Sequence, residues 1–255
     1  MDLQSLAERF WNHETAAIAV AGSFARGDEG IFSDIDLARF LKTDTQGQDA
    51  GTHLIDDRFV VVSDVGPRKV EQCFTDPLDA TEYVAGLRTA RPLRDPDGYL
   101  EAIQKRAREF VWDEAIERKA HAWASAEMVG WIEEVQKGLE GLTRGDEGRM
   151  LNARHGLTWG LARVMRVQRG ILISSDNGFF PEVIAEIGAD SEWARLFRTA
   201  FGIGGVTELR EQVKSGLRLY VLTARMISAT LSREDRPLID EAARRIVEFR
   251  DLGQW

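Results

Sequence analysis

The hydrophobic pattern of the chain changes near residue 98, and this change limits the folds that the sequence can form. Up to about residue 95, short apolar runs of strand length are separated by turn-forming residues. After Tyr99, apolar residues recur every three or four positions, as is typical of amphipathic helices. We therefore predict an α+β chain with a small mixed-sheet domain over residues 1–97 and a C-terminal helical bundle over residues 98–255.

The first region is predicted to alternate between short strands and polar turns. Ser23 is placed to act as the N-cap of a short helix. The pair Asp56-Asp57 lies between two strand-like runs and predicts a hairpin. Predicted strands are Ala16–Ala21, Ile35–Leu41, His53–Ile55, Arg58–Val62 and Arg91–Arg94. Predicted helices are 2–13, 23–29, one beginning near Leu100, Ala120–Leu142, Leu151–Arg169, 180–188, 191–200, 207–231 and 235–250.

The composition predicts a folded protein with an acidic surface. The 255 residues carry a net charge of −9, which argues against a nonspecific grip on nucleic acid and favours a small cationic partner. Cys73 is the only cysteine, which excludes an internal disulfide and a thiolate metal cluster. The apolar run Ala16–Ala21 is too short to cross a bilayer, and no signal-peptide core precedes it. We expect no membrane association and a cytoplasmic location.

The residues with the clearest chemical meaning lie between the first two predicted strands. Gly22-Ser23 follows one strand directly, and Asp34-Ile35-Asp36 opens the next. Alternation along a strand places Asp34 and Asp36 on one face, and two adjacent carboxylates suit Mg²⁺ that also binds substrate phosphates. Glycine lets the backbone approach a phosphate closely. The plainer interpretation is a capped helix beside solvated acids, but the combination favours a nucleotide site.

These residues carry a resemblance to a known family. The stretch from Gly22 through Asp28, together with Phe32 to Leu37, resembles the signature of the polymerase-β-like nucleotidyltransferase superfamily. Within that superfamily the chain resembles the branch that modifies kanamycin and related aminoglycosides. Two further stretches share the likeness, Arg91–Leu100 and Glu133–Lys137.

The resemblance implies a role for each matching residue. Asp34 and Asp36 would bind Mg²⁺ and take part in catalysis. Glu133 would act as general base on the acceptor hydroxyl, with Glu134 and Glu127 as rival positions. The residues implied to contact the triphosphate or lie near it are Gly22, Ser23, Arg26, Ser33 and Lys137. Plainer interpretations are an ordinary salt bridge between Glu133 and Lys137, and an ion pair of Arg26 with Asp28 or Asp34.

One position departs from the superfamily pattern. Many members place a third metal-binding carboxylate on the strand that follows the Asp-x-Asp strand. In this sequence Val61 falls at that position, and Asp56, Asp57 or Asp64 would have to substitute. This departure puts a second catalytic metal in doubt.

The resemblance implies an O-nucleotidyltransferase that uses Mg²⁺ and a nucleoside triphosphate, with ATP as the expected donor. Its acceptor would be a small, cationic molecule of the aminoglycoside type. The products would be the nucleotidylated acceptor and pyrophosphate. The alternatives are a nucleotide-binding regulatory protein of the same fold and a nucleotidyl modifier of protein or RNA. By analogy with kanamycin-modifying enzymes, the helical half is expected to permit a homodimer.

Overall fold

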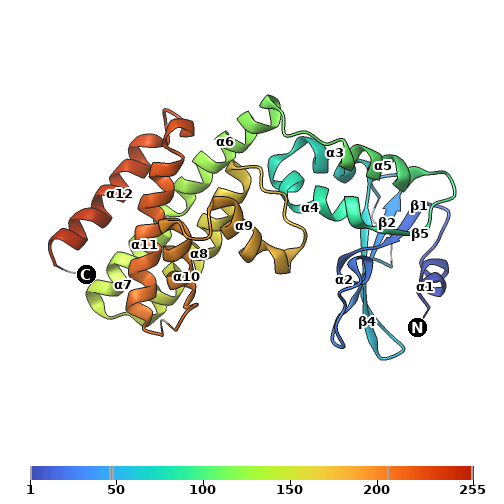
Figure 1. Ribbon diagram of the computed structural model, residues 1–255, viewed down its shortest axis with the longest axis horizontal. Coiled ribbons are helices and arrows are strands. Elements are labelled where there is room, and N and C mark those ends of the chain that lie inside the picture. The colour runs from blue at the N-terminus through green and yellow to red at the C-terminus, as the bar shows by residue number, and fades with distance from the viewer. Residues whose placement is uncertain (1, 46, 48, 206, 254) are drawn as a thin grey trace. The chain divides into compact units, whose positions relative to one another are not determined.

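The first region of the chain forms one mixed five-stranded sheet. The structure is a computed structural model that describes residues 2–45, 47, 49–205, 207–253 and 255. The strand order is β3-β4-β2-β1-β5, with β2 and β4 parallel and the other neighbours antiparallel (Figure 1). The predicted α+β class with a mixed sheet is therefore confirmed. The strands are β1 Thr15–Val20, β2 Ile35–Leu41, β3 Gly51–Ile55, β4 Arg58–Val65 and β5 Arg91–Arg94.

Side-chain alternation gives the sheet two different faces. On one face, Ile35 and Leu37 of β2 pair in register with Val60 and Val62 of β4. These four side chains are buried in a core that also includes Leu6, Ala7 and Phe10 from the N-terminal segment around α1 (Leu3–Arg9). The intervening residues of β2 point to the opposite face, because successive side chains on a strand alternate. Asp36 therefore lies on the face that does not carry this core.

Three helices of the first region complete the domain around the sheet. Two of them, α3 (Pro67–Thr75) and α4 (Pro77–Thr89), fall in a stretch for which the sequence predicted neither helix nor strand. Each begins with proline in its first turn, and the Asp76 side chain caps α4 by accepting from Leu78 N at 3.0 Å and Asp79 N at 3.1 Å. The third, α5 (Tyr99–Arg108), follows β5 directly.

Every regular element among the described residues of the second region is a helix. Its core contains the large side chains of Trp193, Phe197 and Tyr220. The polar atoms of these side chains are satisfied, since Trp193 Nε1 donates to Thr223 Oγ1 at 2.9 Å and the Tyr220 hydroxyl donates to Met128 O at 3.1 Å. The α-helices are α6 Glu114–Gly130, α7 Ile132–Arg144, α8 Glu147–Gln168, α9 Phe179–Ile187, α10 Glu192–Phe201, α11 Leu209–Met226 and α12 Arg236–Asp251.

The helix predicted over Ala120–Leu142 is two helices. α6 ends at Gly130 and α7 begins at Ile132, so the chain is interrupted at Trp131. Glycine has low helix propensity because it loses much backbone entropy in a helix, which favours a break at this point. The single-helix prediction was wrong at this position.

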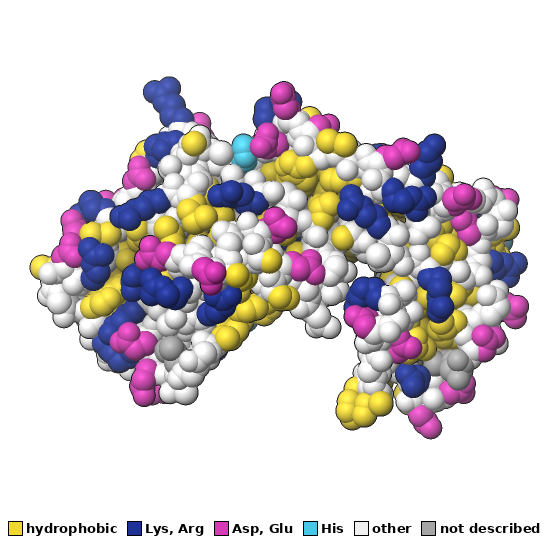
Figure 2. Space-filling view, viewed as in Figure 1, with side chains coloured by type: hydrophobic (Ala, Val, Ile, Leu, Met, Phe, Trp, Pro, Cys, Tyr) yellow, Lys and Arg dark blue, Asp and Glu magenta, His cyan; other side chains and the backbone are white. Residues whose placement is uncertain are grey.

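The chain folds as two compact units, and each unit is built from two separate stretches of the sequence. The first unit contains residues 1–113 and 172–179, and the second contains 114–171 and 180–255. The sequence-based division at residue 97 lies before α5, which clusters with the first unit. Among the described helices, none combines the length and apolar character needed to cross a bilayer. Basic and acidic side chains are interspersed on the face shown in Figure 2.

Candidate functional site

The turn between β1 and β2 packs its backbone directly against the side chain of Asp36. Gly22 has φ of 60°, and a β-carbon at this position would lie 2.2 Å from Oδ2 of Asp36. The preceding residue, Ala21, donates its backbone N–H to the carbonyl of Asp36 at 2.8 Å. Only glycine fits this position without moving the carboxylate. The glycine turn and the Asp-x-Asp strand, neighbours in the sequence motif, therefore form one site in space.

The helix after this turn differs from the prediction. α2 spans Gly22–Arg26, and Gly27 ends it in the left-handed conformation with φ of 77°. Its N-cap is Ala21, and no side-chain hydrogen bond caps it. The prediction of Ser23 as N-cap was wrong, since α2 begins at Gly22 and Ala21 takes the cap position. Ser23 instead lies inside the first turn, next to the glycine that contacts Asp36.

Arg26 offsets only part of the negative charge of Asp34 and Asp36, the two acids of the motif. Asp34 is exposed and immediately precedes β2, whereas Asp36 is half-buried within the strand. Burial raises the pKa of the Asp36 carboxyl, and the neighbouring charge of Asp34 raises it further. The guanidinium of Arg26 opposes these effects, and Asp176 adds to them. Negative charge is thus gathered at Asp36 beyond what Arg26 offsets.

Arg26 lies near the acidic pair without forming an ion pair with it. Its Nε lies 3.2 Å from Oδ2 of Asp28, so the plainer expectation of an Arg26–Asp28 pair is confirmed. Its side chain is 23 % exposed, and its charge still lowers the pKa of Asp36. The pair with Asp28 is a surface interaction of small energy. Arg26 is therefore a cation beside the acids that an anionic ligand can recruit.

Ser33 organises the loop that leads into β2. Its N–H donates to the carbonyl of Gly30 at 3.1 Å, and its Oγ accepts from the N–H of Gly30 at 2.9 Å. These reciprocal bonds close a compact turn. The two central residues of the turn, Ile31 and Phe32, are 84 % and 95 % exposed. Ser33 therefore holds an exposed apolar turn next to Asp34.

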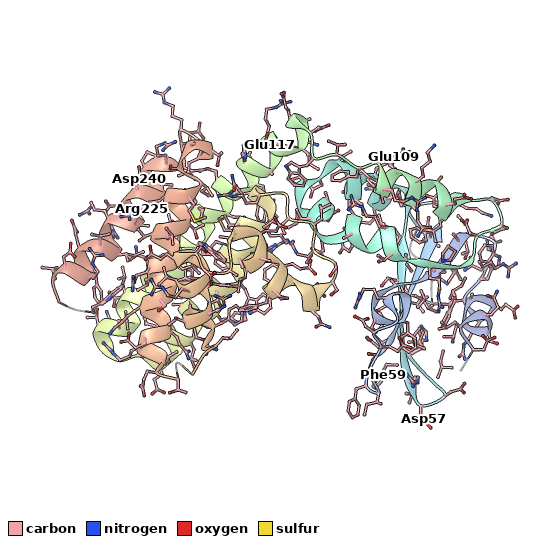
Figure 3. All side chains as sticks on the ribbon, viewed as in Figure 1. Asp57, Phe59, Glu109, Glu117, Arg225 and Asp240 are labelled. Atoms are coloured by element: carbon pink, nitrogen blue, oxygen red, sulfur yellow. The ribbon has the colours of Figure 1, made fainter. Side chains whose placement is uncertain are left out.

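The strand beside the motif has no acid opposite Asp36. Asp36 pairs in register with Val61 of β4, so the residue opposite this acid on the neighbouring strand is valine. Asp64 is committed elsewhere, because it forms a bidentate pair with Arg39 at 2.7 and 3.1 Å. Asp56 and Asp57 form the β3–β4 turn with positive φ, and Figure 3 shows Asp57 at the tip of that hairpin. None of these three acids takes the place of the missing carboxylate.

A divalent cation fits the donor set that is present. Among the described residues, no three His, Cys, Asp or Glu side chains lie close enough together to hold a metal ion by themselves. Mg²⁺ in phosphate-transfer sites is commonly held by one or two carboxylates, with substrate phosphates and water supplying the other ligands. Asp34 and Asp36 supply two carboxylates, and their mutual repulsion is relieved by a bound cation.

The residues implied by the third matching stretch lie together on α7 of the second unit. Lys137 Nζ lies 2.9 Å from Oε1 of Glu133 and 2.7 Å from Oε1 of Glu134, which confirms the plain i,i+4 salt bridge. The Glu133 side chain is 75 % exposed and that of Glu134 only 15 %. Hydrogen bonding to Lys137 lowers the pKa of Glu133. The rival Glu127 lies on the preceding helix, α6.

Comparison with known proteins agrees with this geometry. Residues 3–83 match the family model described as a nucleotidyltransferase domain. No curated protein sequence matches the chain. Among solved structures, a nucleotidyltransferase-like protein from Exiguobacterium sibiricum superposes with a TM-score of 0.52 at 14 % identity, over 89 % of this chain and 78 % of that one. The chain therefore has a nucleotidyltransferase-like fold, and its residues 3–83 match the nucleotidyltransferase domain family in sequence.

Proposed function

We propose that this protein transfers a nucleoside monophosphate from a nucleoside triphosphate, with ATP as the expected donor, to a hydroxyl of a small molecule. The observation that carries the proposal is the packing of the Gly22 backbone against the Asp36 carboxylate, inside the segment that matches the nucleotidyltransferase domain. This arrangement brings a backbone that a phosphate can approach next to a carboxylate that a cation can bind.

In this proposal Asp34 and Asp36 hold a nucleotide-bound Mg²⁺. The ion would supply Lewis-acid stabilisation of the charge that develops on the phosphoryl oxygens. Ser23 and Ser33 offer hydroxyl groups to the phosphates on either side of the acidic pair. Arg26 exchanges its surface pair with Asp28 for the phosphate charge, since a guanidinium bonds phosphate oxygens strongly.

The bond changes define what the remaining residues must do. The acceptor oxygen bonds to the α-phosphorus, the bond from that phosphorus to the bridging oxygen breaks, and pyrophosphate leaves. The hydroxyl proton must pass to a base, and we assign this role to Glu133 on the basis of its motif position. A well-placed general base contributes about 10²–10⁴-fold. Lys137 is assigned to the charge of the phosphates.

The acceptor class follows from charge. A chain with a net charge of −9 attracts a polycation more readily than a polyanion. We therefore propose a cationic acceptor of the aminoglycoside type, which would make the protein an antibiotic-resistance enzyme.

Pyrophosphate release with Mg²⁺, ATP and a panel of aminoglycosides and lincosamides tests the proposal. The wild-type chain is expected to release pyrophosphate with at least one acceptor. Glu133→Gln is expected to lower kcat by about 10²-fold while nucleotide affinity stays unchanged. If Glu134→Gln has this effect and Glu133→Gln does not, the base is Glu134. If calorimetry detects binding of neither nucleotide nor Mg²⁺ to the wild-type chain, the proposal is wrong.

A second candidate function is supported by Val61. With no acid opposite Asp36 on β4, the chain is also suited to bind nucleotide without turning it over, as a regulatory protein. Nucleotide binding without pyrophosphate release from any acceptor favours this candidate. Labelling of protein or RNA from α-labelled nucleotide would instead identify a macromolecular acceptor. The homodimer and the cytoplasmic location stay predictions.

A further inference from the structure

Strand β4 presents apolar side chains on the sheet face that carries the proposed metal ligands. Val60 and Val62 of β4 are buried in the core. Phe59 and Val61 therefore point to the opposite face, because successive side chains on a strand alternate. That face also carries Asp36, whose register partner is Val61. Phe59 is 61 % exposed, so an aromatic ring on this face lies open to solvent.

Strand β3 extends this apolar surface. Leu54 of β3 pairs in register with Phe59, and the side chains of directly paired residues lie on the same face. Leu54 is 67 % exposed, although its partner could have covered it. Figure 2 shows apolar side chains exposed at the end of the first unit where Figure 3 labels Phe59. Leu54, Phe59 and Val61 are here called the apolar strip.

The apolar strip reaches the first acid of the motif. Ile35 of β2 pairs in parallel register with Val60, so one step back along both strands places Asp34 beside Phe59. Phe32, two residues before Asp34, is also exposed. The proposed metal ligands therefore lie next to apolar groups that the protein itself does not cover.

The strand order separates the apolar strip from the turn that would bind the phosphates. In the order β3-β4-β2-β1-β5, the strip lies on one side of β2 and β1 lies on the other. Gly22 and Ser23 follow β1, and the backbone of Gly22 packs against Asp36. The acids are thus flanked by a glycine turn for the donor on the β1 side and by the apolar strip on the β4 side.

We propose that the apolar strip positions the acceptor, and that the acceptor carries an apolar group beside the hydroxyl that receives the nucleotide. This inference rests on the proposed function, since it assumes that the acids hold a nucleotide-bound ion. It narrows the proposed cationic acceptor to an amphipathic one. Covering an exposed aromatic ring with an apolar group of the ligand removes both surfaces from water, which favours binding.

A second copy of the chain fits this surface less well than a small molecule does. A two-fold interface uses the same surface patch on both copies. A contact through the apolar strip would therefore bring the carboxylates of Asp34 and Asp36 from both copies near one another, and juxtaposed like charges weaken association. A small cation meets no such repulsion, and the net charge of −9 favours it.

The test is a fluorescence titration of the full chain with a naphthyloxy propanolamine, in the presence of Mg²⁺ and a nonhydrolysable ATP analogue. This probe carries a hydroxyl, one amine and a fluorescent apolar ring. Isopropylaminopropanol, which has the hydroxyl and the amine without the ring, is measured by competition. The wild-type chain is expected to bind the probe at least about tenfold more tightly than the ring-free compound.

Variants of Phe59 assign this preference to the apolar strip. Phe59→Thr keeps a residue that suits a strand and is expected to weaken probe binding by about tenfold. Phe59→Leu keeps an apolar side chain and is expected to retain most of the affinity. Calorimetry should show the same affinity for the ATP analogue in both variants as in the wild-type chain.

The matched control is Val111→Thr, which removes exposed apolar surface from the same unit. Val111 follows Glu109 by two residues, and Figure 3 shows Glu109 and Phe59 at opposite ends of that unit. This variant is expected to bind the probe as the wild-type chain does.

The outcomes separate this inference from the proposed function. If the wild-type chain binds the ATP analogue with Mg²⁺ but prefers neither amine, the inference is overturned and the proposed function stands. Equal weakening of probe binding by Val111→Thr and Phe59→Thr would mean nonspecific adhesion and would also overturn it. If Phe59→Thr weakens binding of the ATP analogue and not of the probe, the strip serves the nucleobase instead. If the wild-type chain binds neither the analogue nor Mg²⁺, the proposed function itself fails.

Discussion

Strand β2 contributes to two charged sites that differ in how their charge is compensated. Near its C-terminal end, Arg39 is fully buried, pairs with Asp64 through two hydrogen bonds and donates a third to the carbonyl of Phe10 at 3.2 Å. At its N-terminal end, Asp34 and Asp36 repel each other, and Arg26 offsets them only in part. The first site is complete within the protein. The second retains excess negative charge, as functional sites often do.

The difference separates an acid that serves the fold, Asp64, from an acid that the proposed function assigns to a ligand, Asp36. Asp64 is 6 % exposed and also accepts from the N–H of Gly47 at 2.7 Å, so each of its oxygens has a partner in the protein. Asp36 is half-buried and faces a glycine that leaves room for its carboxylate. Variants of the two acids should therefore lose different properties.

The largest effect is expected for Asp36→Asn. This change removes a carboxylate from the proposed metal site and should lower pyrophosphate release by at least about 10³-fold, because several kcal/mol of metal-based stabilisation is lost. The melting temperature should not fall, since Asn relieves charge repulsion. Steady-state kinetics and thermal unfolding measure the two properties. Undiminished activity would refute Asp36 as a metal ligand, and Asp97→Asn serves as the control.

Asp64→Asn should show the reverse pattern. Loss of the carboxylate leaves the buried Arg39 charge with only its longer ion pair to Asp49 at 3.5 Å, and breaking a buried pair typically costs up to about 3–5 kcal/mol of unfolding free energy. Activity measured below the melting temperature should stay near that of the wild-type chain. Denaturant unfolding gives the free energy. The control is Asp57→Asn at the exposed hairpin turn, where Asn tolerates positive φ, with an expected change below about 0.5 kcal/mol. Equal stability of both variants would mean that the Arg39 pair is not structural.

Gly22→Ala should perturb the site more than the fold. Its β-carbon would displace the Asp36 carboxylate, and a misplaced catalytic group costs about 10²-fold in activity. The left-handed backbone should also cost about 1–2 kcal/mol of stability. Gly86→Ala on α4, where a β-carbon meets nothing within 4 Å, should keep both activity and stability. Full activity in Gly22→Ala would show that this contact is dispensable.

The smallest effect is a pH dependence of stability. An acid whose pKa is higher in the folded state than in the unfolded state destabilises the fold when ionised, and this destabilisation disappears as the pH falls through the raised pKa. Asp36→Asn should therefore be more stable than the wild-type chain near neutral pH, by a small margin because the carboxyl is only half-buried. The difference should vanish at about pH 3.5, below the usual pKa of Asp. Urea unfolding at both pH values checks the sign, and a less stable variant at neutral pH would contradict it.

Much of the fold could be predicted because local patterns determine it. β2 was predicted at its observed bounds, since Ile35 and Leu37 alternate with polar or small residues, and the hairpin turn at Asp56-Asp57 was also confirmed. α3 and α4 were missed, although Pro67, Pro77 and the cap Asp76 were signals of their N-termini. The break at Gly130 was missed because periodicity continues across it. The Ser23 cap was wrong because the helix begins at Gly22, a residue whose tight packing against Asp36 no local pattern shows.

The site was predicted only as far as one contiguous motif reaches. Asp34, Asp36 and Gly22 lie close along the sequence, so strand alternation and glycine chemistry were enough to group them. The alignment with the superfamily singled out Val61, and the structure adds that this residue lies opposite Asp36 on β4. The return of residues 172–179 to the first unit could not be found in this way, since no local pattern indicates that a segment between two helices bonds to a distant helix.

The discontinuous first unit also affects how the protein is made. Residues 1–113 leave the ribosome before residues 172–179, the rest of the first unit, have been translated, at about 5–20 residues per second. The contact between Ile173 and Thr81 must therefore form several seconds after the sheet has been synthesised. During biosynthesis, a nascent chain that already carries the whole Asp-x-Asp motif still lacks the last piece of its first unit, and that piece is delivered only after α8 has emerged.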